Sequence, residues 1–170
     1  MTEPESRQPE PLADPLADRP SAFPWPPVLF AAAVVAALSL DGLVLRLPFP
    51  FAETGLVHYV GMLALLAGIV LVGWAMLQFR KHATSVRPDR GSSALMATGP
   101  FAFSRNPIYL GEVIALVGAG ISFNRLWLVL AAPVFAYWVT RLAIEREEAY
   151  LERHFGATYS DYKARVRRWL

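Results

Sequence analysis

A turn that contains glycine and proline is the first part of the chain that could carry chemistry. Residues 98–112 read TGPFAFSRNPIYLGE. Gly99-Pro100 predicts a turn, and Pro107 suits the first position of a helix, where its missing N–H is not needed. The free N–H groups of that helix end, with Arg105 beside them, would bind an anion. The alternative is a plain interfacial turn whose arginine binds lipid phosphate.

A run of acids near the C-terminus is the second candidate. Four charged residues recur at helical spacing and would share one face: Arg141, Glu145, Glu148 and Glu152. Glu147 lies on a neighbouring strip of the same helix. Carboxylates this close to a membrane either hold a cation or form ion pairs on a solvated helix. The spacing leaves both possibilities open.

Two more acids, Asp41 and Glu112, fall within apolar stretches and are candidate intramembrane acids. Glu112 lies in the first turn of its predicted helix, where an acid also complements the helix dipole. No metal site is predicted, because the histidines at positions 58, 82 and 154 lack metal-ligand spacing.

Four apolar stretches must position these residues. They cover residues 28–47, 57–79, 108–123 and 126–144. About 20 apolar residues cross the hydrocarbon core, and backbone groups in lipid must bond internally, so each stretch is expected to be a helix. Only Asn124 and Arg125 separate the last two, which predicts a tight hairpin. The third is short and would span only with thinning or snorkelling. The predicted fold class is therefore an all-α integral membrane protein with about four transmembrane helices.

The basic residues predict the orientation of these helices. With four spans, 14 of the 16 Lys and Arg residues lie on the side of both termini, which the positive-inside rule assigns to the cytoplasm. The C-terminal segment should form a helical cap on that side, with a helix end at Gly156 and an apolar stripe of Tyr159, Tyr162 and Val166. Trp169, among arginines, is expected to be an interfacial anchor.

Composition excludes several classes of function. Hydrophobic residues make up 55% of the chain and charged residues 18%, against about 45–50% and 25% in soluble domains. The absence of cysteine excludes disulfides, thiol nucleophiles and Cys-ligated metals, and a net charge of +2 gives no case for nucleic acid. Residues 1–27 hold eight of the 14 prolines, which predicts a disordered tail before a membrane-embedded domain of residues 28–170.

Together the two candidate regions resemble the isoprenylcysteine carboxyl methyltransferase family, which belongs to a wider group with the phospholipid N-methyltransferases. The resemblance covers about residues 57–170. One block spans residues 93–112, where the motif R-(H/N)-P-x-Y follows G-P-F. The other block spans residues 145–169 and contains E-E-x-x-L-x-x-x-F-G-x-x-Y-x-x-Y.

The resemblance implies a methyltransferase that holds S-adenosylmethionine on the cytoplasmic side, between the two blocks. The positions that match the family's cofactor contacts are Leu95, Met96, Phe101, Asn106, Pro107, Tyr109 and Glu147. Arg105 and the adjacent helix end suit the carboxylate of the cofactor, and Glu147 or Glu148 suits its ammonium group. The aromatic rings of Phe101 and Tyr109 suit the sulfonium or the adenine.

The methyl acceptor is less well defined than the cofactor. Asn106 stands where the family often has histidine, Phe101 lacks a tyrosine hydroxyl, and Ala143 stands where eukaryotic members have an arginine that is associated with substrate. Arg141 is the nearest substitute and is the candidate substrate contact. The expected acceptor is a lipophilic molecule that enters from the bilayer, with an isoprenylcysteine-type carboxylate or a phospholipid amine as alternatives. A sterol-reductase-like NADPH enzyme and a lipid-binding membrane scaffold are the other two hypotheses.

Overall fold

The computed structural model describes residues 25–50, 55–85 and 95–170, and its regular elements are all helical within these ranges. Six α-helices follow one another: α1 (Trp25–Ser39), α2 (Gly55–Ser85), α3 (Pro107–Ser122), α4 (Leu126–Val139), α5 (Glu145–Phe155) and α6 (Ala157–Arg165). A π-helical turn, Leu40–Val44, extends α1, and a second one, Thr140–Ile144, joins α4 to α5. A 3-10 turn, Gly99–Ala102, precedes α3. The predicted all-α architecture is confirmed.

Three helices are long and apolar enough to cross a membrane: Pro26–Val44, Gly55–Lys81 and Leu126–Phe155. The fourth predicted span, α3, has 16 residues and lies alongside them. A count of four membrane crossings therefore stays a prediction. Helix α1 begins at Trp25, three residues inside the predicted tail, because Pro26 and Pro27 occupy a first turn that needs no proline N–H. Residues 1–24 of that tail lie outside the described residues.

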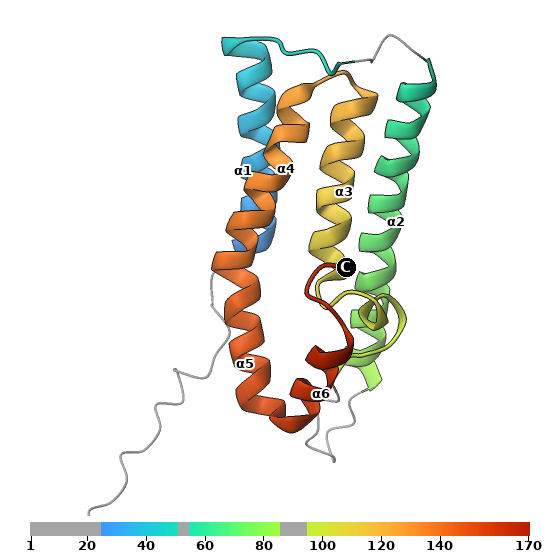
Figure 1. Ribbon diagram of the computed structural model, residues 1–170, viewed down its shortest axis with the longest axis vertical. Coiled ribbons are helices and arrows are strands. Elements are labelled where there is room, and N and C mark those ends of the chain that lie inside the picture. Colours follow the sequence, from blue (N-terminus) through green and yellow to red (C-terminus); the bar gives the residue numbers. More distant parts are fainter. Residues whose placement is uncertain (1–24, 51–54, 86–94) are drawn as a thin grey trace, which may run out of the picture.

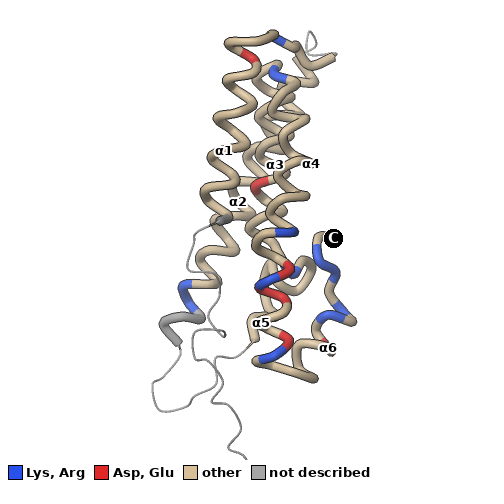
Figure 2. The backbone as a smooth tube through the Cα atoms, turned by 90° about the vertical axis from the view of Figure 1, so that its left-hand side faces the viewer, with Lys and Arg blue, Asp and Glu red and all other residues tan. Residues whose placement is uncertain are grey.

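The four apolar helices stand in a row in the order α1, α4, α3, α2 (Figure 1). The main core forms where α1, α3 and α4 meet, around the buried side chains of Leu116, Phe135 and Val139. Trp169, expected at the membrane interface, packs against this core and is partly buried. Lys, Arg, Asp and Glu are concentrated along α5, α6 and the C-terminal segment (Figure 2).

Helices α2 and α3 touch through glycines. A Cβ atom at Gly68 would lie 2.5 Å from the Gly111 carbonyl oxygen and 2.6 Å from the Ala115 nitrogen, and one at Gly111 would meet Val72 and the Gly68 carbonyl. Small residues at such a contact let two backbones approach closely, which is the main way that helices attract each other in lipid. This contact fixes α3, and hence the turn before it, against α2.

An ion pair ties the helices together at the end away from α5. Asp41, in the π-helical turn after α1, has a side chain only 2% exposed and accepts a hydrogen bond from Arg125 in the α3–α4 hairpin. In the same hairpin the Asn124 side chain accepts a hydrogen bond from the Phe49 N–H at 2.6 Å. The predicted tight hairpin is confirmed, and the partner of Asp41 is identified.

Helices α4 and α5 form one continuous rod through the π-helical turn Thr140–Ile144. A π-helical turn accommodates one extra residue, so every later side chain is rotated by about 100° relative to an uninterrupted α-helix. The rotation brings Glu148 to the buried side of α5 and leaves Arg146 exposed. The insertion therefore decides which acids of α5 face the protein.

Replacement of Gly68 by alanine should weaken the α2–α3 contact, because the added methyl group meets backbone atoms that cannot move aside. Gly73 of the same helix is the matched control, since a Cβ there has no neighbour within 4 Å. Gly73→Ala should be neutral or stabilising by up to about 1 kcal/mol through helix propensity, and Gly68→Ala should destabilise by about 1–3 kcal/mol. Thermal unfolding in detergent measures both, and equal effects of the two substitutions would contradict the contact.

Candidate functional site

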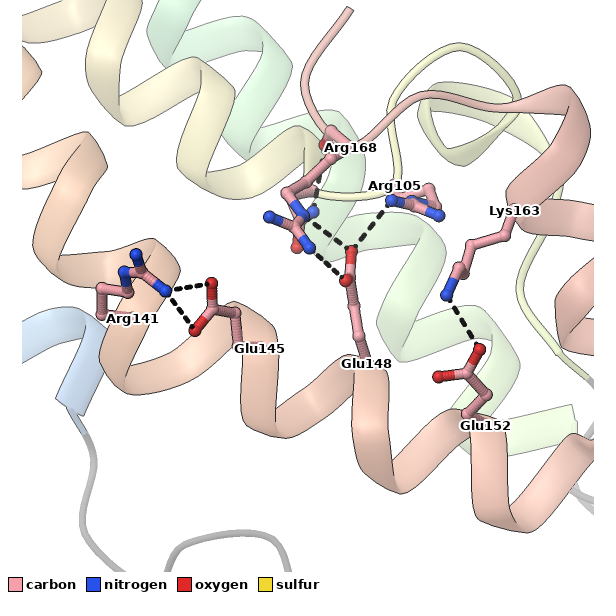
Figure 3. A network of polar contacts seen from close by, with 8 residues as sticks. Arg105, Arg141, Glu145, Glu148, Glu152, Lys163 and Arg168 are labelled. Atoms are coloured by element: carbon pink, nitrogen blue, oxygen red, sulfur yellow. Dashed lines mark hydrogen bonds and ion pairs between the residues drawn. The ribbon is translucent and has the colours of Figure 1, made fainter.

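Glu148 lies at the centre of an ion-pair cluster between α5, the turn before α3 and the C-terminal segment (Figure 3). Its Oε1 lies 3.0 Å from Arg105 Nη2 and accepts a hydrogen bond from Arg168 Nε at 3.1 Å, while its Oε2 lies 2.7 Å from Arg168 Nη2. The side chains of Glu148 and Arg105 are only 11% and 10% exposed, and that of Arg168 is 37% exposed. Two guanidinium groups thus share one carboxylate, which leaves a net positive charge.

The C-terminal segment, residues 166–170, is also held by hydrogen bonds to the turn before α3. This turn carries Arg105, Asn106 and Pro107 and is called the RNP turn below. The Arg105 N–H donates to the Arg167 carbonyl at 3.0 Å, and the Asn106 side-chain amide donates to the Arg168 carbonyl at 3.0 Å. The Asn106 N–H in turn donates to Ser104 Oγ at 3.2 Å. In this structure Asn106, a predicted cofactor contact, therefore fixes the C-terminal segment through its side chain.

Tyr109 and Glu147 form a second polar contact beside this cluster. Pro107 occupies the first position of α3 as predicted, and Tyr109 follows in the same turn. The Tyr109 hydroxyl donates to Glu147 Oε1 at 3.0 Å. Tyr109 is buried, whereas Glu147 is an exposed residue whose hydrogen bond to Tyr109 is partly buried.

A small aromatic core supports the site from the side of α6. Tyr159, Tyr162 and Val166, the stripe predicted from the sequence, are all buried, and Leu95 packs against them. The Tyr162 hydroxyl donates to the Phe101 carbonyl at 2.7 Å. Burial raises the pKa of Tyr159 and of Tyr162 to about 12, so both phenols stay neutral. Because ionisation is harder in the folded state, the free energy of unfolding does not depend on these two phenols below pH 10, and it falls as the pH rises from 10 towards 12.

The structure brings most of the predicted site residues together. Pro107 and Tyr109 open α3, the backbone of Phe101 is bound by Tyr162, and Met96 is half-buried next to Leu95 in the chain. Arg141, the predicted substrate contact, does not reach this group. Its side chain is 56% exposed and pairs with Glu145 on its own helix at 3.0 Å, because the two residues are one turn apart.

Arg168 is the residue of the cluster that sequence reasoning missed. The sequence placed it only in a basic ending beside Trp169, and no periodicity links position 168 to position 148. The acids of α5 also differ in their surroundings, and their spacing in the sequence did not predict this difference. Glu148 is buried between two arginines, whereas Glu152 pairs with Lys163 of α6 at 2.8 Å on the exposed side. Among the described residues no group of His, Asp and Glu could hold a metal ion.

Comparison with known proteins identifies the family. The family model for phospholipid methyltransferases matches residues 56–158, which include the RNP turn, Tyr109 and both Glu147 and Glu148. The chain belongs to the phospholipid methyltransferase family. An uncharacterized protein of Haemophilus influenzae is 35% identical over 63 residues, which are all of that protein and 37% of this chain. No solved structure matches. The predicted membership of the wider methyltransferase group is confirmed.

Replacement of Glu148 by glutamine should destabilise the protein strongly, because it leaves two buried or half-buried arginines without their shared counter-charge. Loss of one partner of a buried pair costs about 3–5 kcal/mol. Glu145→Gln is the matched control, since its pair with Arg141 is exposed and worth about 0–1 kcal/mol. Unfolding in detergent and protease sensitivity of the C-terminal segment measure both effects. A Glu148 variant as stable as the Glu145 variant would show that the cluster does not hold this segment.

Proposed function

We propose that this protein transfers a methyl group from S-adenosylmethionine to a lipophilic acceptor at the membrane. The family supports methyl transfer, and the three helices that are long and apolar enough to cross a membrane support a reaction at the bilayer. The observation that carries the choice of cofactor is the pairing of two opposite charges at one site. The cluster around Glu148 has a net positive charge, and the acid Glu147, an exposed residue, is next to Glu148 in the chain.

The residues present fit the amino-acid part of S-adenosylmethionine, which has a carboxylate and an ammonium group. Arg105 and Arg168 share the single carboxylate of Glu148, so the cluster retains a positive charge that suits the carboxylate. Glu147 has the Tyr109 hydroxyl as its one partner among the described residues and suits the ammonium group. Glu148 has both oxygens engaged by arginines, so Glu147 is the better choice of the two.

When bound, S-adenosylmethionine supplies a methyl group on a positively charged sulfur. The protein's part is to align that group with the acceptor and to exclude water, which brings two reactants together at a high effective concentration. The rings of Phe101 and Tyr109 are the candidate contacts for the sulfonium or the adenine. Arg141 lies at the exposed edge of the α4–α5 rod and is the candidate contact for a polar head group of the acceptor.

The site is expected on the cytoplasmic side, because 14 of the 16 basic residues lie on that side of a four-span chain. A reductase that uses NADPH and a scaffold that binds lipid phosphate are the rival hypotheses. The reductase would bind NADPH in place of S-adenosylmethionine, and the scaffold would bind neither. Calorimetric titration of the protein in detergent with each cofactor separates the three.

Glu147→Gln should weaken binding of S-adenosylmethionine by a factor of about 10–150, because a hydrogen bond to a charged group is worth ~1.5–3 kcal/mol. Glu152→Gln is the control, since Glu152 is exposed and pairs with Lys163, and its loss should change affinity less than about fivefold. Isothermal titration of both variants, after a check that each is folded, measures the difference. Equal affinities would remove Glu147 from the site.

A further inference from the structure

Glu112 is a carboxyl group on the protein-facing side of an apolar helix. It follows Tyr109 by three residues and precedes Leu116 by four, so the three share one face of α3. Tyr109 and Leu116 are both buried in the core that α3 forms with α1 and α4. The glycines at 111 and 118 contact α2 and lie on a different face. Glu112 is therefore directed into the helix bundle, where it is half-buried.

The Oε2 atom of Glu112 is buried and finds no hydrogen-bond partner among the described residues. An acid in such surroundings costs free energy, and acids within membrane helices usually mark a functional site. The helices that pack around Glu112 carry few charged side chains near it. Helix α1 has no titratable side chain, α4 has only the exposed Tyr137, and the α4–α5 junction has Arg141, which pairs with Glu145. The remaining titratable groups on the neighbouring elements are Tyr109, with Glu147 beyond it, and on α2 His58 and Tyr59 at one end and Arg80, Lys81 and His82 at the other.

Glu112 lies next to the proposed cofactor site on its membrane side. Three residues along α3 correspond to about 4.5 Å of helix, so Glu112 is one turn further into the bundle than Tyr109, whose hydroxyl binds Glu147. A lipophilic acceptor that comes from the bilayer would pass Glu112 before it meets a cofactor held at Arg105 and Glu147. Of the other acids nearby, Glu148 is engaged by Arg105 and Arg168, and Glu147 is the proposed partner of the cofactor's ammonium group.

We infer that Glu112 accepts the proton of an amine acceptor, an inference that rests on the proposed methyl transfer. A protonated amine has no lone pair, so its N–H proton must first pass to the Glu112 carboxylate. The nitrogen lone pair then forms the N–C bond to the methyl group while the C–S bond breaks, and the sulfur leaves as a neutral thioether. Glu112 returns its proton to water. An acceptor carboxylate has no proton to lose, and the negative charges of Glu112 and Glu147 would repel it.

The test uses the full-length protein in lipid vesicles with labelled S-adenosylmethionine and four probes. Two probes carry an amine, octadecylamine and phosphatidylethanolamine, and two carry a carboxylate and no amine, octadecanoate and an N-acetylated farnesylcysteine. The label should enter the amines alone. Label in the carboxylates alone, or in none of the four while the cofactor still binds, would overturn the inference. Failure of the wild-type protein to bind the cofactor would overturn the proposed function instead.

Glu112→Gln should lower kcat for the amine at least 100-fold, the lower limit of a typical acid–base contribution, with little change in KM or in cofactor affinity. Its residual rate should rise about tenfold per pH unit below the pKa of the amine, because only amine that is already neutral reacts. Glu112→Asp keeps a carboxylate and should restore part of the rate. Glu152→Gln, on the exposed face of α5, should leave the rate unchanged.

Thermal stability separates this role from a structural one. Glutamine in place of an acid without a partner should leave the melting temperature unchanged or raise it, because the amide is cheaper to bury than a charge. A Gln variant with normal kcat would overturn the inference. The inference would also be overturned if the Gln variant were slow and had a lowered melting temperature, if high pH did not restore its rate, and if Glu112→Asp did not recover activity.

Discussion

One shared carboxylate holds this protein's candidate site together. Glu148 accepts from Arg105, in the turn before α3, and from Arg168, at the C-terminal end. Without its charge the two guanidinium groups would repel each other, and the C-terminal segment would keep its hydrogen bonds to Arg105 and Asn106 and the packing of Trp169 against the main core. The α4–α5 rod delivers Glu148 to this position, because the π-helical turn Thr140–Ile144 sets the rotation of α5.

The three acids around Tyr109 have different surroundings and therefore suit different tasks. Both oxygens of Glu148 are paired with arginines, so this acid holds the surrounding segments together. Glu147 is exposed and keeps most of its capacity to bind a cation, and Glu112 is directed into the bundle with one oxygen that lacks a partner among the described residues. The charge therefore changes along α3, a gradient from the positive cluster before its first turn to Glu112 one turn further along, whose Oε2 has no partner among the described residues. A cofactor with both charges and an acceptor that must lose a proton match the two ends of that gradient.

Local features of the sequence predicted much of this arrangement, and long-range features did not. Hydropathy located the four apolar helices, Pro107 marked the start of α3, and Gly156, with its positive φ of 49°, marked the end of α5. The stripe of Tyr159 and Tyr162 correctly predicted the buried face of α6. The partners Arg168 for Glu148 and Arg125 for Asp41 were beyond reach, because each lies 20 to 84 residues away in the chain and no periodicity encodes the pair. The sequence also did not predict the contact of Trp169 with the core, because that contact depends on where the C-terminal segment, held by Glu148, lies.

Amide hydrogen exchange with and without S-adenosylmethionine shows which parts of the protein hold the cofactor. If the cofactor binds between the RNP turn, α5 and the C-terminal segment, it should slow exchange in residues 101–110, 145–152 and 166–170. Exchange in the hairpin around Asn124 and in the turn Leu40–Val44, at the opposite end of the helices (Figure 1), should stay the same. Protection confined to the hairpin end, or none anywhere at saturating cofactor, would contradict the account.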